Sequence, residues 1–140
     1  MFTIQMKRIY TAPEAADGYR VLVDRLWPRG IRKTEAGLDD WVRADAPSTA
    51  LRKSFAHQPE RFQDFQKAYR AELDQNPDAL NFVHFCEAVL SSRNVTLLYA
   101  AKDETYNNAA VLLEWLQDQL YSRSSACSQL QASRHSSAEQ

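Results

Sequence analysis

The sequence predicts an α/β fold: a small three-layer-like sheet with parallel central strands covered by helices, and an edge strand that is antiparallel or loosely paired. Two segments carry this prediction. Residues 19–26 contain Val21, Leu22 and Val23 in succession, and residues 95–101 read VTLLYAA. Such unbroken apolar runs are typical of strands with both faces covered. About seventy residues with helical patterns separate the two, enough for the crossover that joins parallel neighbours.

The edge strand is expected at residues 3–10, TIQMKRIY, where apolar and polar side chains alternate irregularly. Residues 11–18 then form a turn. A parallel crossover with its helix takes about a dozen residues or more. Because this connection is shorter, we expect the first and second strands to be antiparallel or only loosely paired.

Helix signals follow the second strand. Ser48 is a good N-cap for TALRKSF, Pro59 suits the first turn of ERFQDFQKAYRAEL, and Asn76 with Pro77 repeats the pattern before DALNFVHFCEAVL. A last helix is expected over residues 107–120. The second of these helices carries one apolar stripe at steps of three and four, made by Phe62, Phe65, Tyr69 and Leu73.

The chain has 140 residues, the usual size of one domain. We expect a single α/β domain over residues 1–120. From residue 121 the sequence is rich in Ser and has no apolar period. Residues 121–140 are therefore expected to form a disordered tail.

Composition excludes several classes of protein. Lys and Arg number 17 against 18 Asp and Glu, so the net charge of -1 offers no global attraction to nucleic acid or to an anionic membrane. No apolar run approaches the ~18 residues that cross a membrane. Cys86 and Cys127 form no CxxC, and the three His stand at no zinc-site spacing, so we expect no metal. These unpaired thiols, with a start (MFTIQMKRIY) unlike a signal peptide, predict a cytoplasmic protein.

Cationic side chains gather where the two central strands end. Parallel neighbours bring their carboxyl ends to one edge, where open α/β sheets bind ligands. An arginine fork can donate two parallel hydrogen bonds to a phosphate or carboxylate and keeps its proton, and a helix N-terminus adds unpaired amides. The expected ligand-binding residues are Arg25, Trp27, Arg29, Arg32, Arg52, Lys102 and Asn107.

Three residues at this edge are candidate bases should a reaction follow binding. Asp24 and Asp103 come directly after the two strands, and His57 follows a short helix that can fold over them. Each also has a structural interpretation: Asp24 as half of an ion pair with a covering helix, Asp103 as a turn cap, and His57 as a helix-end residue favoured by the dipole. The sequence contains no Walker loop, GxGxxG or complete catalytic constellation, so whether the protein is an enzyme stays open.

Three segments in this order, DGYRVLVDRLWPRGIRK, APSTALRKSF and TLLYAAKDETYNNAAVLL, resemble the YeaO-like family, domain of unknown function 488. The resemblance spans about residues 4 to 120. It implies a compact α/β domain of bacterial origin with no cofactor. A more distant branch has a Cys at the end of the last strand and Cys-His-Arg in the next turn. Here Ala100-Ala101 and Tyr106-Asn107-Asn108 stand instead, so that branch's suspected thiol or metal chemistry is not expected.

Three functional interpretations remain. The first is a small anionic ligand, bearing phosphate or carboxylate, bound at the sheet edge. The second is a non-catalytic module in which the loop from Arg29 to Lys33 holds nucleic acid or an acidic protein surface. In the third, the Asp and Arg side chains only form an internal ionic framework, and the function lies elsewhere.

Overall fold

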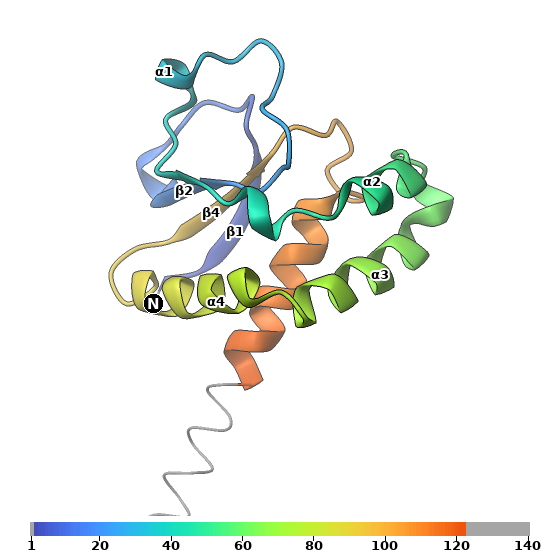
Figure 1. Ribbon diagram of the computed structural model, residues 1–140. Coiled ribbons are helices and arrows are strands. Elements are labelled where there is room, and N and C mark those ends of the chain that lie inside the picture. The colour runs from blue at the N-terminus through green and yellow to red at the C-terminus, as the bar shows by residue number, and fades with distance from the viewer. Residues whose placement is uncertain (1, 123–140) are drawn as a thin grey trace, which may run out of the picture.

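The computed structural model describes residues 2–122, which form a four-stranded, all-parallel sheet covered by helices (Figure 1). The strands are β1 (Ile4–Arg8), β2 (Tyr19–Leu22), β3 (Asp40–Trp41) and β4 (Val95–Tyr99), in the order β1-β4-β2-β3. The two apolar segments are the central strands β2 and β4, and they are parallel neighbours. The predicted α/β class with parallel central strands is confirmed.

The first strand lies at the edge, as predicted, but its direction corrects the antiparallel alternative. β1 runs parallel to β4 and pairs with it from Ile4 opposite Val95 to Arg8 opposite Tyr99. It does not pair with β2, because β4 lies between them. Residues 9–18 cross β4 with only the 3-10 helix η1 (Ala15–Asp17), so the crossover needs no full helix. The expectation of an antiparallel or loose pairing was wrong because it assumed that a parallel crossover must contain a full α-helix.

The two-residue strand β3 was not expected from the sequence. The segment after β2 contains the one-turn helix α1 (Lys33–Ala36), and β3 follows it. The amides of Asp39 and Val42 donate to the carbonyls of Arg20 and Leu22, which extends the sheet beyond β2. A strand this short has no periodicity to detect.

The structure has helices in all the segments where the sequence predicted them, although one begins differently. Helix α2 (Thr49–Phe55) is capped by Ser48, whose Oγ accepts from the Leu51 amide, and α4 (Pro77–Val89) is capped by Asn76. Pro59 instead begins the 3-10 helix η3 (Pro59–Arg61), which leads into α3 (Phe62–Asp74). A further 3-10 helix, η2 (Arg43–Asp45), precedes α2, and residues 108–122 are helical. Residues 123–140, most of the predicted tail, lie outside the described residues.

The sheet has an apolar face and a mixed face. On the first, Val21, Val95 and Leu97 share one buried cluster with Phe65, Tyr69 and Leu73 of α3, and α4 and the last helix contribute to the same cluster. The other face carries a smaller cluster of Ile9, Leu22, Ala36 and Leu98 beneath α1 and its flanking loops. In Figure 1, α3 and α4 run below the strands, whereas α1 lies at the top. No helix within residues 2–122 has both the length and the apolar character to cross a membrane.

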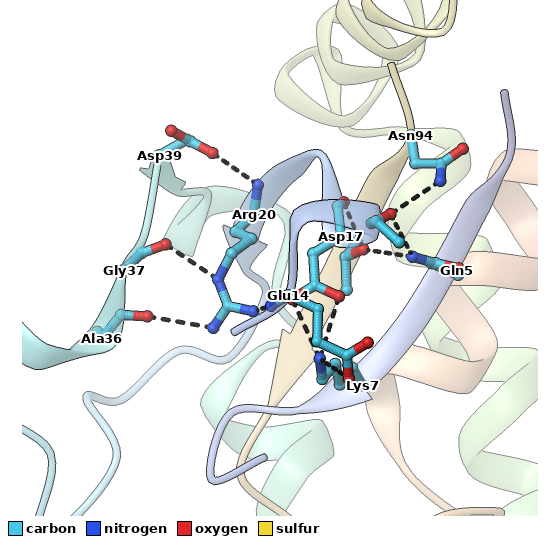
Figure 2. A network of polar contacts seen from close by, with 11 residues as sticks. Gln5, Lys7, Glu14, Asp17, Arg20, Ala36, Gly37, Asp39 and Asn94 are labelled. Atoms are coloured by element: carbon cyan, nitrogen blue, oxygen red, sulfur yellow. Dashed lines mark hydrogen bonds and ion pairs between the residues drawn. The ribbon is translucent and has the colours of Figure 1, made fainter. Parts of the chain in front are cut away.

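A buried ionic network fills the rest of the second face (Figure 2). Asp17 and Arg20, both nearly inaccessible, form an ion pair, and Lys7 Nζ lies 3.1 Å from each carboxylate oxygen of Asp17. Burial disfavours the Asp17 charge, but the Glu14 amide and these two cations outweigh it and lower the pKa of Asp17. Arg20 also donates to the carbonyl of Gly37 at 3.0 Å. The network thereby joins the loops around η1 and α1 to β2.

Gly18, at the start of β2, lies where two backbones nearly touch. Its φ is +65°, and a Cβ placed there would stand 2.2 Å from the carbonyl oxygen of Asn94. That carbonyl accepts from the Tyr19 amide at 2.8 Å, while the Asn94 side chain bonds Thr3 and Ala16. The close approach positions the amino ends of β2 and β4 side by side.

Replacing Gly18 by Ala should therefore reduce the free energy of unfolding by about 3 kcal/mol or more, because strain at positive φ adds to a backbone clash. Gly30→Ala is the matched control, since Gly30 has φ +77° but open space around its Cα. The Gly30→Ala variant should lose only about 1 kcal/mol of its free energy of unfolding. Urea unfolding of both variants measures the difference, and equal losses would contradict the close approach.

Candidate ligand pocket at the carboxyl edge of the sheet

A pocket of about 750 Å³ opens where β2 and β4 end. The two strands are in register through Leu22 opposite Leu98, and the Val23 amide continues the pairing by donating to the Leu98 carbonyl at 3.0 Å. The loops that follow the two strands therefore leave the same edge. Helix α2 and the turn after it provide the third wall.

The pocket brings together most of the residues that the sequence singled out. Its lining includes Asp24, Arg25, Trp27 and Arg29 after β2, Lys102 and Asp103 after β4, and Arg52 and His57 from the α2 segment. Arg32 lies outside the lining, at the N-terminal end of α1. Asn107 is also outside it. The side-chain amide of Asn107 caps the last helix: its Oδ1 accepts from the Ala110 amide, and its Nδ2 donates to the Asp103 carbonyl, both at 2.8 Å.

Asp24 joins three elements. Its Oδ2 accepts from the Ala100 amide at the end of β4 at 2.9 Å, and its Oδ1 accepts from the Asn108 side chain at 3.0 Å. Its backbone carbonyl accepts from Trp41 Nε1 at 2.7 Å. Burial raises the pKa of Asp24, and the Asn108 and Ala100 hydrogen bonds, with the nearby charges of His57 and Arg52, oppose that rise. The carboxyl group thus holds the pocket floor together.

Arg25 and Trp27 also make structural contacts. Arg25 Nε donates to the Pro47 carbonyl at 3.0 Å, which ties the segment before α2 to the end of β2. Trp27 Nε1 donates to the Ile31 carbonyl at 2.7 Å, and its ring meets Trp41 edge-on at 5.4 Å between centroids. Each side chain lines the pocket while fixing a loop.

Asp103 caps the turn before the last helix. Its Oδ1 accepts from the amides of Thr105 and Tyr106, both at 2.9 Å. These two hydrogen bonds lower the pKa of Asp103, so it remains a carboxylate over the physiological range. A carboxylate in this state is a poor proton acceptor near neutral pH.

Three lining cations form no side-chain hydrogen bond or salt bridge with any residue in the range 2–122: Arg29, Arg52 and Lys102. Arg52 differs from the others because its Nε is buried and still lacks an acceptor. A buried donor without a partner is costly, and it commonly marks a site completed by water or a ligand. The lining side chains that are available to bind a ligand are therefore cationic.

Within residues 2–122, Asp45 is another buried side chain with an unpaired atom, and it lies outside the pocket lining. Asp45 Oδ2 has no partner among the described residues. Burial, followed by the charges of Asp78 and Asp40, raises the pKa of Asp45 to about 7. The protonated acid, which is the form tolerated in an apolar environment, is thereby favoured below neutrality.

His57 reaches the pocket through an unusual backbone. Ala56 and His57 have φ of 48° and 57°, two consecutive non-glycine residues in the left-handed region. Such strain is concentrated at functional sites when the surrounding structure holds it in place. The His57 ring packs 5.9 Å from that of Phe55. The sequence contains no clear signal for this turn: His is enriched at positive φ among non-glycine residues, but Ala is not, and neither identifies a turn by itself.

Sequence reasoning missed the apolar lining and Asn108. The missed residues include Leu26, Pro28, Phe55, Phe65 and Asn108. Phe55 and Phe65 look like core residues in sequence and are indeed buried, but their rings, stacked at 4.5 Å, also form part of the pocket wall. Asn108 was detectable, since an Asn pair opens the last helix at the predicted edge.

Replacing Asp24 by Ala should lower the free energy of unfolding by about 2 to 4 kcal/mol, because two partly buried donors lose their acceptor. Asp103→Ala removes a carboxylate from the exposed turn and should cost clearly less. Chemical denaturation of the two variants makes the comparison. A Asp24→Ala variant as stable as the natural protein would show that the carboxyl group does not join the strand ends.

The arrangement defines a small α/β protein with a cation-lined pocket at the carboxyl edge of a parallel sheet. A family model described as the "Inactive DUF488-N3 subclade" matches residues 3–138, so the chain belongs to this family. Among similar proteins, the Escherichia coli K12 uncharacterized protein YeaO is 45% identical over 113 residues, which cover 81% of this chain and 96% of YeaO.

The uncharacterized protein Rv3073c of Mycobacterium tuberculosis H37Rv is 37% identical over 114 residues, covering 81% of this chain and 92% of that protein. The uncharacterized protein Mb3100c of Mycobacterium bovis has the same identity and coverage. No solved structure matches the chain.

Proposed function

We propose that this protein binds a small phosphate- or carboxylate-bearing ligand in the carboxyl-edge pocket, with Arg52 as the principal contact and Arg29 and Lys102 around it. The observation that carries the proposal is the buried Arg52 Nε, which has no hydrogen-bond acceptor within residues 2–122. An anion would supply that acceptor, and a guanidinium makes its strongest hydrogen bonds to carboxylate and phosphate oxygens.

The contrast with other arginines supports this choice. Arg20 is saturated by Asp17 and by the carbonyls of Ala36 and Gly37. Arg8 donates to the carbonyls of Ala100 and Ala101 at 3.3 and 2.9 Å, beside the end of β4. Arg70 Nη1 is also buried without a hydrogen-bond partner, but it lies 3.7 Å from Glu114 Oε1, and Nη2 of the same guanidinium pairs with Asp118. Within residues 2–122, Arg52 is the pocket-lining arginine whose buried donor has no acceptor.

Charge favours an anion as well. The lining carries four cationic side chains of Arg and Lys and two carboxylates, a surplus of two positive charges. In a concave site with apolar walls, such a surplus raises the local concentration of anions. Arg25 donates its Nε–H to the Pro47 carbonyl, but this neutral acceptor leaves its charge in place, so all four cations contribute to the potential in the pocket.

The proposal is limited to binding. The matching subclade is described as inactive, and two of the candidate bases are engaged elsewhere: Asp24 by Ala100 and Asn108, and Asp103 by its turn. His57 remains the candidate for proton transfer. A second candidate function, a nucleic acid or acidic protein surface, is favoured by exposed Arg29, Arg32 and Lys33 on one loop.

A thermal-shift titration separates the two candidates. Millimolar phosphate or a carboxylate should raise the melting temperature by several degrees, as expected when ligand exceeds its Kd about a hundredfold. Arg52→Gln should abolish the shift, whereas Arg32→Gln, outside the pocket, should leave it unchanged.

The polyanion alternative predicts the reverse. Affinity for a nucleic acid or acidic peptide would fall steeply with salt, and Arg32→Gln would weaken it while Arg52→Gln would not. A melting temperature indifferent to every small anion, or an equal shift in the Arg52→Gln variant, would refute the small-ligand proposal.

A further inference from the structure

The pocket is too large for a simple ion. At about 750 Å³ it falls within the range of about 300 to 1,000 Å³ that is typical of sites for drug-sized molecules. Inorganic phosphate displaces only a few waters of about 30 Å³ each. Most of the pocket would therefore stay filled with water if its ligand were a bare anion.

Much of the wall is apolar. Leu26, Pro28, Phe55 and Phe65 line the pocket together with the small side chains of Ala100 and Ala101. The alanines leave space directly above the end of β4. Water against such a wall is unfavourable, and a ligand with an apolar body would displace it.

Leu26 is the clearest sign of an unfilled apolar contact. The residue is 56% exposed although it lies between Arg25 and Trp27, both of which the fold fixes by hydrogen bonds. The backbone is therefore held in a position that presents Leu26 to the pocket. A ligand lying against Leu26 would remove it from water.

The aromatic side chains of the lining favour a flat partner. Tyr10, which is 45% exposed, is the aromatic ring that the pocket lining offers to a ligand. Phe55 and Phe65 are almost fully buried and stack on each other at 4.5 Å, so they form the rigid backing of the wall. Tyr10 is held at its place by its hydroxyl, which donates to the Arg29 carbonyl at 2.8 Å. Flat rings make extensive contact with such surfaces.

From these observations, and resting on the proposed function above, we infer that the ligand is an amphipathic anion: one phosphate or carboxylate joined to a ring-sized apolar body. The anionic group meets Arg52, Arg29 and Lys102, and the ring lies against Leu26 and Tyr10, the exposed apolar side chains of the lining. Apolar walls with a few convergent polar groups are the usual construction of a small-molecule site.

Isothermal titration of the full chain with phenyl phosphate, inorganic phosphate and phenol tests the inference. Phenyl phosphate should bind at least about tenfold more tightly than inorganic phosphate, the effect expected from burying one leucine-sized apolar contact. Phenol should bind far more weakly than phenyl phosphate. Benzoate and adenosine monophosphate, added as further arms, distinguish a carboxylate from a phosphate and a single ring from a nucleobase.

Two variants assign the parts of the ligand. Leu26→Ser should weaken phenyl phosphate about tenfold and leave inorganic phosphate unchanged, whereas Arg52→Gln should weaken both. Leu80→Ser is the matched control: Leu80 is 42% exposed on α4, outside the pocket lining, and its replacement should change neither affinity. Circular dichroism verifies that each variant is folded.

The outcomes separate the two proposals. If phenyl phosphate and phosphate bind equally, depend on Arg52 and ignore Leu26, the amphipathic ligand is refuted and anion binding stands. If none of the phosphates and carboxylates binds, or if phenol binds as tightly as phenyl phosphate, both proposals are overturned. Saturation-transfer NMR on the ring protons provides a second readout, and the absence of transfer from the protein to the ring would also refute the inference.

Discussion

The hydrogen bonds of the Asp24 carboxyl group are the constraint on which the pocket depends. One oxygen accepts from the amide at the end of β4 and the other from Asn108 at the start of the last helix, while Asp24 itself terminates β2. Parallel pairing alone brings two strand ends to one edge. The carboxyl group then fixes the loops that follow, so that Arg29 and Lys102 line one cavity. Its raised pKa reflects the cost of placing this acceptor where water is largely excluded.

Arginine has two distinct uses in this protein. At the opposite end of the sheet, Arg20 joins Asp17 and two backbone carbonyls, and the resulting network covers a face that no long helix covers (Figure 2). At the carboxyl edge, Arg25 is likewise satisfied by the chain, but Arg52 is not. The third interpretation of the sequence, an internal ionic framework, therefore describes Arg20 well. It does not account for Arg52 Nε, which is buried beside the pocket and has no acceptor within residues 2–122.

The sequence predicted the central strands and their common edge because Val21–Val23 and VTLLYAA are unbroken apolar runs, a pattern that survives without tertiary information. It could not predict the direction of β1. The short connection between β1 and β2 crosses β4, and the sequence does not show that β4 lies between them. The cations of the site were visible as a cluster. Leu26, Phe55 and Phe65 were not, because an apolar residue in sequence looks the same whether it faces the core or a cavity. The left-handed conformation of Ala56 and His57 was not predicted either, because Ala rarely adopts it and a single His is too weak a signal.

The most direct measurement is a proton–nitrogen NMR titration that follows the Arg52 side-chain Nε–H resonance as phenyl phosphate is added. We expect this resonance to shift saturably and to become protected from exchange, because the anion offers the nitrogen an acceptor that residues 2–122 do not. The Arg20 Nε–H, already bonded to the Gly37 carbonyl, is the internal reference and should not move. An Arg52 signal that stays fixed while the ligand binds elsewhere, or that shifts no more than Arg20, would contradict an anion site at the carboxyl edge.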